Sequence, residues 1–169
     1  MRSAHGRVIW RRNFRPQHMP ISVKYVHTSI VARDWISLSR FYVRALGCKP
    51  KPPERNLKGE WLDRATSLKD AHIEGIHLKL PGYGVGGPTL EIFQYSKERK
   101  GGSAAINKPG YAHIAFAVQD IAKALEKVER HGGGRVGEIV SEEIDGVGSI
   151  NFVYGRDPEG NIIELQKWR

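Results

Sequence analysis

Two histidines and two glutamates stand at matching places in the two halves of this sequence. His27 and His113 each lie in a run of residues typical of a strand, and an Asp follows seven positions after each His. Glu91 and Glu164 each stand between two aliphatic residues, with a glycine four positions earlier. Imidazole nitrogens and carboxylate oxygens together suit a borderline divalent cation. We therefore predict one divalent metal ion, nickel, zinc, cobalt or manganese, held by His27, Glu91, His113 and Glu164.

The four side chains are expected on one face of the protein. Side chains alternate along a strand, so Glu91 faces away from Leu90 and Ile92 if these two pack beneath a helix. The same reasoning applies to Glu164 and to both histidines. Two carboxylates on a partly buried face need a cation or strong hydrogen-bond donors, because a buried unpaired charge is costly. A shared metal ion would satisfy all four groups.

The elements around these residues repeat, which predicts two copies of one folding unit. Each His-containing strand leads to an Asp that can cap a helix, Asp34 in the first half and Asp120 in the second. A glycine stands twenty positions after each His, and Gly132-Gly133-Gly134 is expected to end the second helix. Asp157-Pro158-Glu159-Gly160-Asn161 is expected to form a turn before the last strand. The further strand candidates are residues 59–63, 71–80 and 89–95, then 134–140, 149–155 and 161–167.

The order of elements is βαβββ twice, which predicts an α+β fold of two tandem modules forming a cupped mixed sheet around the metal site. We expect the first module at residues 21–95, a linker at 96–109 and the second module at 110–169. Residues 1–20 contain five arginines and no acidic residue. They are expected to be a disordered basic N-terminal tail, although an organellar presequence, or a natural start at Met19, would fit the same composition.

Charge and cysteine content exclude several classes of function. The net charge is +9, from 27 basic and 18 acidic residues, and the five tail arginines leave 22 basic residues scattered along the rest. No nucleic-acid partner is therefore expected. No apolar run approaches the roughly 18 residues of a membrane span, so we expect a soluble, cytoplasmic protein without a membrane partner. The single Cys48 can form no internal disulfide and is expected to be a packing residue.

Several of these motifs resemble the vicinal oxygen chelate superfamily. They are the paired His-x6-Asp strands, the helix around Phe41-Tyr42 that leads to Leu46-Gly47, and the 157–161 turn before Ile163-Glu164-Leu165. The superfamily includes glyoxalase I, methylmalonyl-CoA epimerase, extradiol dioxygenases and fosfomycin- and bleomycin-resistance proteins. The resemblance implies a metal in a cup formed by both sheets, bidentate binding of two vicinal substrate oxygens, and His27, Glu91, His113 and Glu164 at the four ligand positions.

The ligand order His, Glu, His, Glu resembles that of metal-dependent glyoxalase I, whereas dioxygenases have a His in place of Glu91. We therefore expect an enzyme, a lyase, isomerase or epimerase that transfers a proton next to a chelated carbonyl. Glu164 is the first choice for the catalytic base and Glu91 the second. The residues that hold glutathione in glyoxalase I are replaced here by Val31 and Tyr95. An acyl-CoA or another small molecule with vicinal oxygens is thus favoured as substrate.

Two other functions stay open, an extradiol-type dioxygenase and a metal-free protein that binds small molecules or confers resistance. A homodimer is expected by analogy with the family. His72 and His77 are left out of the predicted site, because their spacing of five puts them on opposite faces of a strand, one at the surface and one in the core.

Overall fold

The computed structural model describes residues 22–98, 102 and 104–169, so the predicted tail at 1–20 lies outside the described residues. In the described part, no helix is long and apolar enough to cross a membrane. The elements, in chain order, are β1 (His27–Val31), α1 (Trp35–Leu46), β2 (Lys49–Lys58), α2 (Glu60–Thr66), β3 (His72–Lys79), β4 (Thr89–Tyr95), β5 (Ile114–Ala117), α3 (Ile121–Arg130), β6 (Gly134–Arg135), β7 (Val140–Ile144), β8 (Gly148–Arg156) and β9 (Ile162–Trp168).

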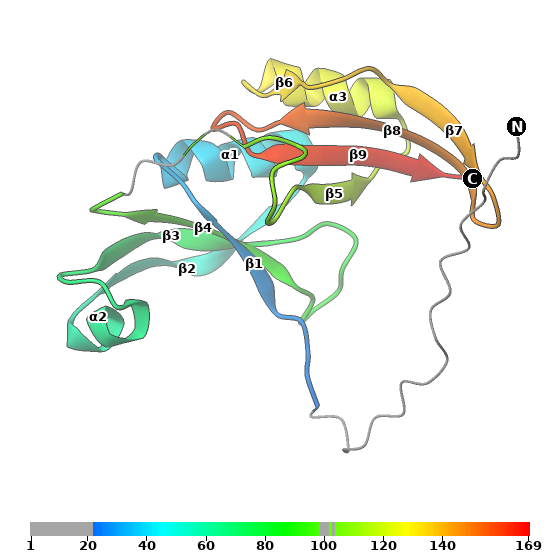
Figure 1. Ribbon diagram of the computed structural model, residues 1–169. Coiled ribbons are helices and arrows are strands. Elements are labelled where there is room, and N and C mark those ends of the chain that lie inside the picture. The colour runs from blue at the N-terminus through cyan, green and yellow to red at the C-terminus, as the bar shows by residue number, and fades with distance from the viewer. Residues whose placement is uncertain (1–21, 99–101, 103) are drawn as a thin grey trace, which may run out of the picture.

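The strands form two sheets, one in each half of the chain (Figure 1). The first has the order β1-β4-β3-β2, and the second has the order β5-β9-β8-β6 with β7 also paired to β8. Both sheets are mixed, because β1 pairs with β4 in parallel and β5 pairs with β9 in parallel, while the other pairings are antiparallel. The predicted α+β fold of two repeated modules is confirmed. Each module has its own sheet.

The predicted strand at 59–63 is wrong, because these residues enter the short helix α2 and the strand that precedes β3 is β2. This strand was not predicted because it contains Pro50, Pro52 and Pro53. Proline has no backbone N–H to donate to a neighbouring strand. β2 tolerates them because it lies at the edge of its sheet. The predicted strand at 134–140 is also wrong in detail, because the chain there forms two separate strands, β6 and β7.

Both long helices begin at the predicted capping residues. The Asp34 carboxylate accepts a hydrogen bond from the backbone N–H of Ser37, and the Asp120 carboxylate accepts one from Lys123. Helix α1 ends at Gly47, whose φ of 73° lies in the left-handed region that glycine adopts without strain. The strand–helix order that positions both histidines is thus set by local sequence signals.

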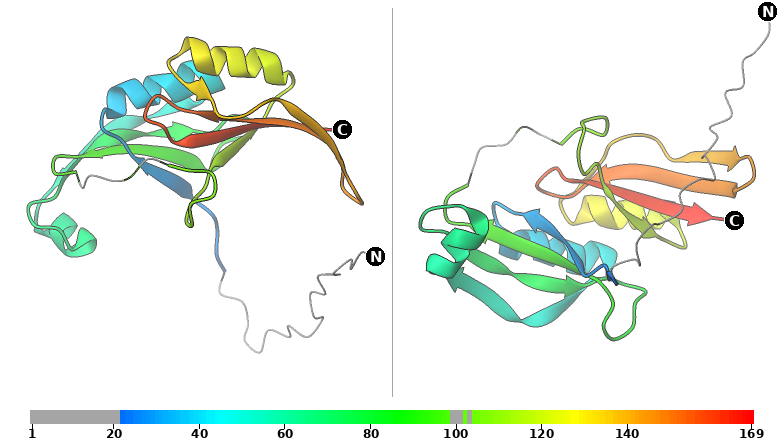
Figure 2. Two further views of the ribbon diagram at one scale, coloured as in Figure 1. Left: turned by 45° about the horizontal axis from the view of Figure 1, so that its top comes forward. Right: turned by 60° about the horizontal axis from the view of Figure 1, so that its bottom comes forward.

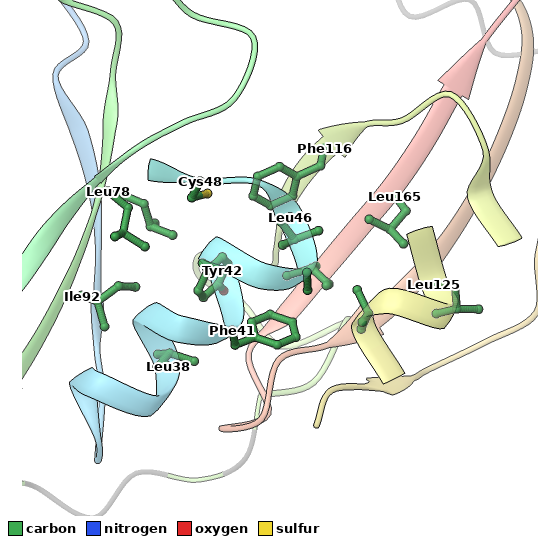
Figure 3. Close-up of a cluster of buried hydrophobic side chains, with 14 of the residues drawn as sticks. Leu38, Phe41, Tyr42, Leu46, Cys48, Leu78, Ile92, Phe116, Leu125 and Leu165 are labelled. Atoms are coloured by element: carbon green, nitrogen blue, oxygen red, sulfur yellow. The ribbon is translucent and has the colours of Figure 1, made fainter. Parts of the chain in front are cut away.

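A single hydrophobic cluster joins the two modules (Figure 3). Leu38, Phe41 and Tyr42 of α1 pack in it together with residues of the second module. The second module contributes Phe116, Ile121, Leu125, Val128, Val153, Ile163 and Leu165. Helices α1 and α3 both lie on the same side of the two sheets (Figure 2). The opposite face of each sheet is therefore left for other side chains.

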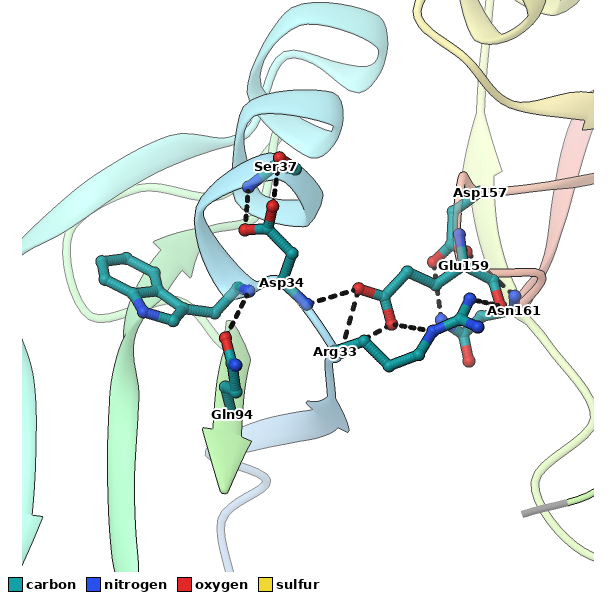
Figure 4. Close-up of polar contacts among 8 residues, drawn as sticks. Arg33, Asp34, Ser37, Gln94, Asp157, Glu159 and Asn161 are labelled. Carbon is teal, nitrogen blue, oxygen red and sulfur yellow. Dashed lines mark hydrogen bonds and ion pairs between the residues drawn. The ribbon is translucent and has the colours of Figure 1, made fainter. Parts of the chain in front are cut away.

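The predicted 157–161 turn connects the modules through hydrogen bonds (Figure 4). The Glu159 carboxylate accepts hydrogen bonds from the backbone N–H groups of Arg33, at 2.8 and 3.0 Å, and of Asp34, at 2.9 Å. The buried Tyr42 hydroxyl donates to Asp157 Oδ2 at 2.9 Å. Gly160 supplies the left-handed position of the turn, with φ 92°. The start of α1 is thus fixed to the hairpin between β8 and β9.

Candidate metal centre

The first predicted pair of ligands, His27 and Glu91, comes together on the first sheet. Strands β1 and β4 run in parallel with Thr89 opposite His27, so Glu91 lies two residues further along on the same face. His27 Nε2 lies 3.3 Å from Glu91 Oε2. Leu90 and Ile92 are fully buried in the core on the helix side, which leaves Glu91 on the open side as predicted.

The second pair, His113 and Glu164, repeats this arrangement on the second sheet. His113 directly precedes β5, and Glu164 lies on the neighbouring strand β9. His113 Nε2 lies 2.9 Å from Glu164 Oε2. Its ring is also 5.3 Å from that of Tyr154, the residue opposite Glu164 on β8. Burial raises the pKa of Tyr154, and the nearby Glu164 carboxylate adds to the rise.

The two pairs have similar exposure. The side chains of Glu91 and Glu164 are each 12% exposed, whereas those of His27 and His113 are 42% and 29% exposed. Each carboxylate is therefore held inside the fold, while the imidazole beside it is accessible. This is the arrangement that a ligand entering from the open faces would meet.

The structure divides the four predicted ligands into these two pairs. Among the described residues, no group of three or more His, Cys, Asp or Glu side chains is arranged to hold a metal ion. The separations within the pairs, 3.3 and 2.9 Å, nevertheless suit two neighbouring ligands of one ion, because metal bonds of about 2.0–2.2 Å place adjacent ligand atoms roughly 3 Å apart. Within each pair, the spacing is therefore that of two ligands on one ion.

His77 is a residue of this site that the sequence reasoning missed. It lies opposite Glu91 on β3, and its Nε2 is 2.9 Å from Glu91 Oε1, the carboxylate oxygen that does not face His27. Its Nδ1 is 3.2 Å from Thr89 Oγ1. The side chain is 16% exposed, and this burial lowers the pKa of His77 while the Glu91 carboxylate opposes the shift.

A signal for His77 was present in the sequence. His77 and Glu91 are equally distant from Gly84, in the middle of the glycine-rich turn that joins β3 to β4. A hairpin centred on that turn places the two residues opposite each other. His72, by contrast, contacts Asn56 through its Nε2, at 2.8 Å, and takes no part in the site.

Cys48 is the buried packing residue that was predicted. It belongs to the hydrophobic cluster between the modules, and burial raises the pKa of its thiol to about 12. A thiol with this pKa is protonated at neutral pH and is a poor nucleophile and metal ligand.

With this geometry in view, the family of the chain is clear. Residues 24–165 match the model of the Glyoxalase/Bleomycin resistance protein/Dioxygenase superfamily, and the chain belongs to that superfamily. It is the vicinal oxygen chelate superfamily that the motifs resemble. No curated protein matches the chain.

Solved structures of the same fold support the assignment. A glyoxalase family protein from Bacillus cereus is 22% identical, with a TM-score of 0.68, and the match covers 91% of this chain and 98% of that one. A glyoxalase family protein from Enterococcus faecalis is 21% identical, with a TM-score of 0.54, and the match covers 85% and 96%. At these identities the likeness concerns the fold.

Proposed function

We propose that the chain is a metal-dependent enzyme of the glyoxalase type, a lyase, isomerase or epimerase that moves a proton next to a carbonyl. The observation that carries this proposal is that each module has a His–Glu pair at an equivalent place. The imidazole nitrogen and the carboxylate oxygen lie 3.3 Å apart in the first pair and 2.9 Å apart in the second. His27, Glu91, His113 and Glu164 would hold one divalent ion, such as nickel, zinc, cobalt or manganese. We also propose that the protein works as a homodimer.

The chemistry follows from the donor set. A bound divalent ion acts as a Lewis acid on a carbonyl and its neighbouring oxygen, which acidifies the adjacent carbon-bound proton. A carboxylate on the open face can take up that proton and return it to another carbon or oxygen. Glu164 is the proposed base, because Glu91 is already engaged by both His27 and His77, whereas Glu164 contacts His113. Glu91 remains the second choice.

The substrate we propose is a small molecule with two vicinal oxygens. The glutathione-holding positions of glyoxalase I carry Val31 and Tyr95 here, and Val31 is an exposed apolar side chain that cannot pair with a carboxylate. An acyl-CoA thioester or a related 2-oxo compound therefore fits better than a glutathione adduct.

Metal analysis and a deuterium-exchange assay test the proposal. After reconstitution with each of the four metals, the wild type should hold about one equivalent of ion. In D2O it should exchange the acidic carbon-bound proton of one compound in a panel of acyl-CoA thioesters and glutathione hemithioacetals. Glu164→Gln should lower turnover about 10²- to 10⁴-fold, the usual contribution of a general base.

The control variant is Glu142→Gln, which changes an exposed carboxylate on β7 and should leave turnover unaltered. A wild type that takes up no metal would contradict the enzyme proposal in favour of a metal-free binding protein. Turnover that requires iron(II) and stops without oxygen would instead indicate a dioxygenase.

A further inference from the structure

The two halves of the site differ at two positions around their glutamates. The residue opposite the glutamate on the antiparallel neighbour is His77 in the first sheet and Tyr154 in the second. The residue two places before the glutamate is Thr89 in the first sheet and Ile162 in the second. At these two positions the first half therefore has an imidazole and a hydroxyl group, whereas the second half has a phenol and an aliphatic side chain.

In the first half these groups form a hydrogen-bond chain with one direction. A carboxylate can only accept, so His77 Nε2–H donates to Glu91 Oε1 across 2.9 Å. Nδ1 of the neutral ring is then an acceptor, and the Thr89 hydroxyl donates to it across 3.2 Å. Thr89 is buried, and its backbone N–H donates to the Val26 carbonyl at 3.0 Å. The series of hydrogen bonds thus begins at Thr89, a residue whose backbone is fixed in the sheet.

The second half offers Glu164 no matching support. Ile162 has no polar side-chain atom, and the Tyr154 ring is tilted by 58° against the His113 ring. Among the described residues, the one side-chain partner of the Glu164 carboxylate in the structure is His113. One glutamate is therefore held through both oxygens and the other through one.

We propose that His77 and Thr89 clamp Glu91 through its Oε1 oxygen and so fix the orientation in which this carboxylate meets a metal ion. His77 is a positioning residue that acts through Glu91. The inference rests on the proposed metal-dependent function and adds two residues that position one of its ligands. Groups that orient a metal ligand typically change metal affinity 10- to 100-fold when removed.

The test measures the dissociation constant for Co²⁺ by chelator competition in four variants of the full chain. His77→Ala and Thr89→Val should weaken binding, His77→Ala by about 10- to 100-fold. His77→Gln, whose amide N–H can replace the imidazole donor, should restore the affinity to within about threefold of wild type. His72→Ala removes another histidine of the same strand, one that contacts Asn56, and should leave the affinity unchanged.

Equal affinity of His77→Ala and wild type would overturn the inference. So would an equal loss in His77→Gln and His77→Ala, because that result would mean that the ring contributes packing and no hydrogen bond. Circular dichroism of each variant identifies any that fails to fold, and the Thr89→Val and His77→Gln variants keep the test decisive in that case.

A measurement on the metal-free protein separates this inference from the proposed function. Nitrogen-15 NMR of the histidine rings should show His77 as the Nε2–H tautomer, with a shift of the Nδ1 signal in Thr89→Val. The Nδ1–H tautomer would overturn the clamp even if the protein binds metal. A wild type that binds no metal, but shows the expected tautomer, would overturn the proposed function while the clamp on Glu91 stands.

Discussion

Tyr42 and Asp157 form a buried hydrogen bond between the two modules. Burial raises the pKa of the Tyr42 hydroxyl well above its usual range, so this group keeps its proton and donates a hydrogen bond to Asp157. Burial also raises the pKa of Asp157, while hydrogen bonds from Asn161, Tyr42 and Glu159 oppose the rise. Because the folded state holds the Asp157 proton more tightly than the unfolded state, this group's contribution to stability falls as pH rises through its folded pKa.

Tyr42→Phe is expected to destabilise the protein more at neutral than at acidic pH. The hydroxyl lowers the pKa of the folded Asp157, so its loss matters most when the carboxylate is ionised. A hydrogen bond to a charged group contributes about 1.5–3 kcal/mol, and the loss should approach that value near neutral pH. Urea denaturation at about pH 4 and about pH 7.5 measures the difference. Tyr83→Phe, at an exposed tyrosine, is the control. An equal loss at both pH values would contradict this reading.

At the same scale, the sequence singles out four candidate ligands, whose role as ligands stays a prediction, but it did not single out their neighbour His77. The same spacing occurs in both halves of the sequence around His27, Glu91, His113 and Glu164. Because side chains alternate along a strand, this spacing also indicates on which face of the sheet each one lies. The contact between His77 and Glu91 depends instead on which residues of two strands lie opposite each other. That register is set by the turn between the strands, and a shift of one residue would turn His77 to the other face.

At the scale of elements, strand β3 has to lie close to β4 for His77 to reach Glu91. Gly75 makes this approach possible, because a Cβ atom there would overlap the Ile92 carbonyl oxygen and come within 2.9 Å of Phe93 Cα. We expect Gly75→Ala to lower the free energy of unfolding by roughly 1–3 kcal/mol, the usual cost of overpacking. Metal affinity should fall as well, because β4 carries Glu91.

Thermal unfolding and Co²⁺ titration of this variant check the prediction. Gly84→Ala is the matched control, because an added Cβ at Gly84 would meet open space. If Gly75→Ala were as stable as Gly84→Ala, the close approach of β3 to β4 would not be a requirement of the fold.

The helices and the closing turn could be predicted, because their signals are local. The carboxylates of Asp34 and Asp120 cap their helices by accepting a hydrogen bond from the backbone N–H three residues later. Both partners of this bond lie within a short stretch of sequence. Strand β2 could not be found in this way. Its prolines argue against a strand unless the strand is known to lie at an edge, and the position of a strand in a sheet is a property of the whole fold.

At the scale of the whole molecule, the two modules are held in one relative position. They share a hydrophobic cluster between α1 and α3, and Glu159 and Asp157 tie the β8–β9 hairpin to α1. Both helices cover the same side of the two sheets, so the faces that carry the two His–Glu pairs turn away from the helices together (Figure 2). Because no group of three or more possible ligand side chains lies together within the described part of one chain, a four-ligand centre would take its two pairs from different chains of a dimer.

A mixed dimer of two inactive variants tests where the centre is built. One chain carries His27→Ala and Glu91→Ala, its partner carries His113→Ala and Glu164→Ala, and different affinity tags allow the mixed species to be isolated after co-expression. If each centre uses both pairs of one chain, every centre in the mixed dimer lacks one pair, and tight metal binding should be absent. If each centre is shared between chains, one of the two centres keeps all four ligands, and the metal content should recover to about half that of wild type. The shared core holds the modules where the two pairs of the described chain do not form one cluster, which predicts the second result, and a mixed dimer without tight metal binding would contradict it.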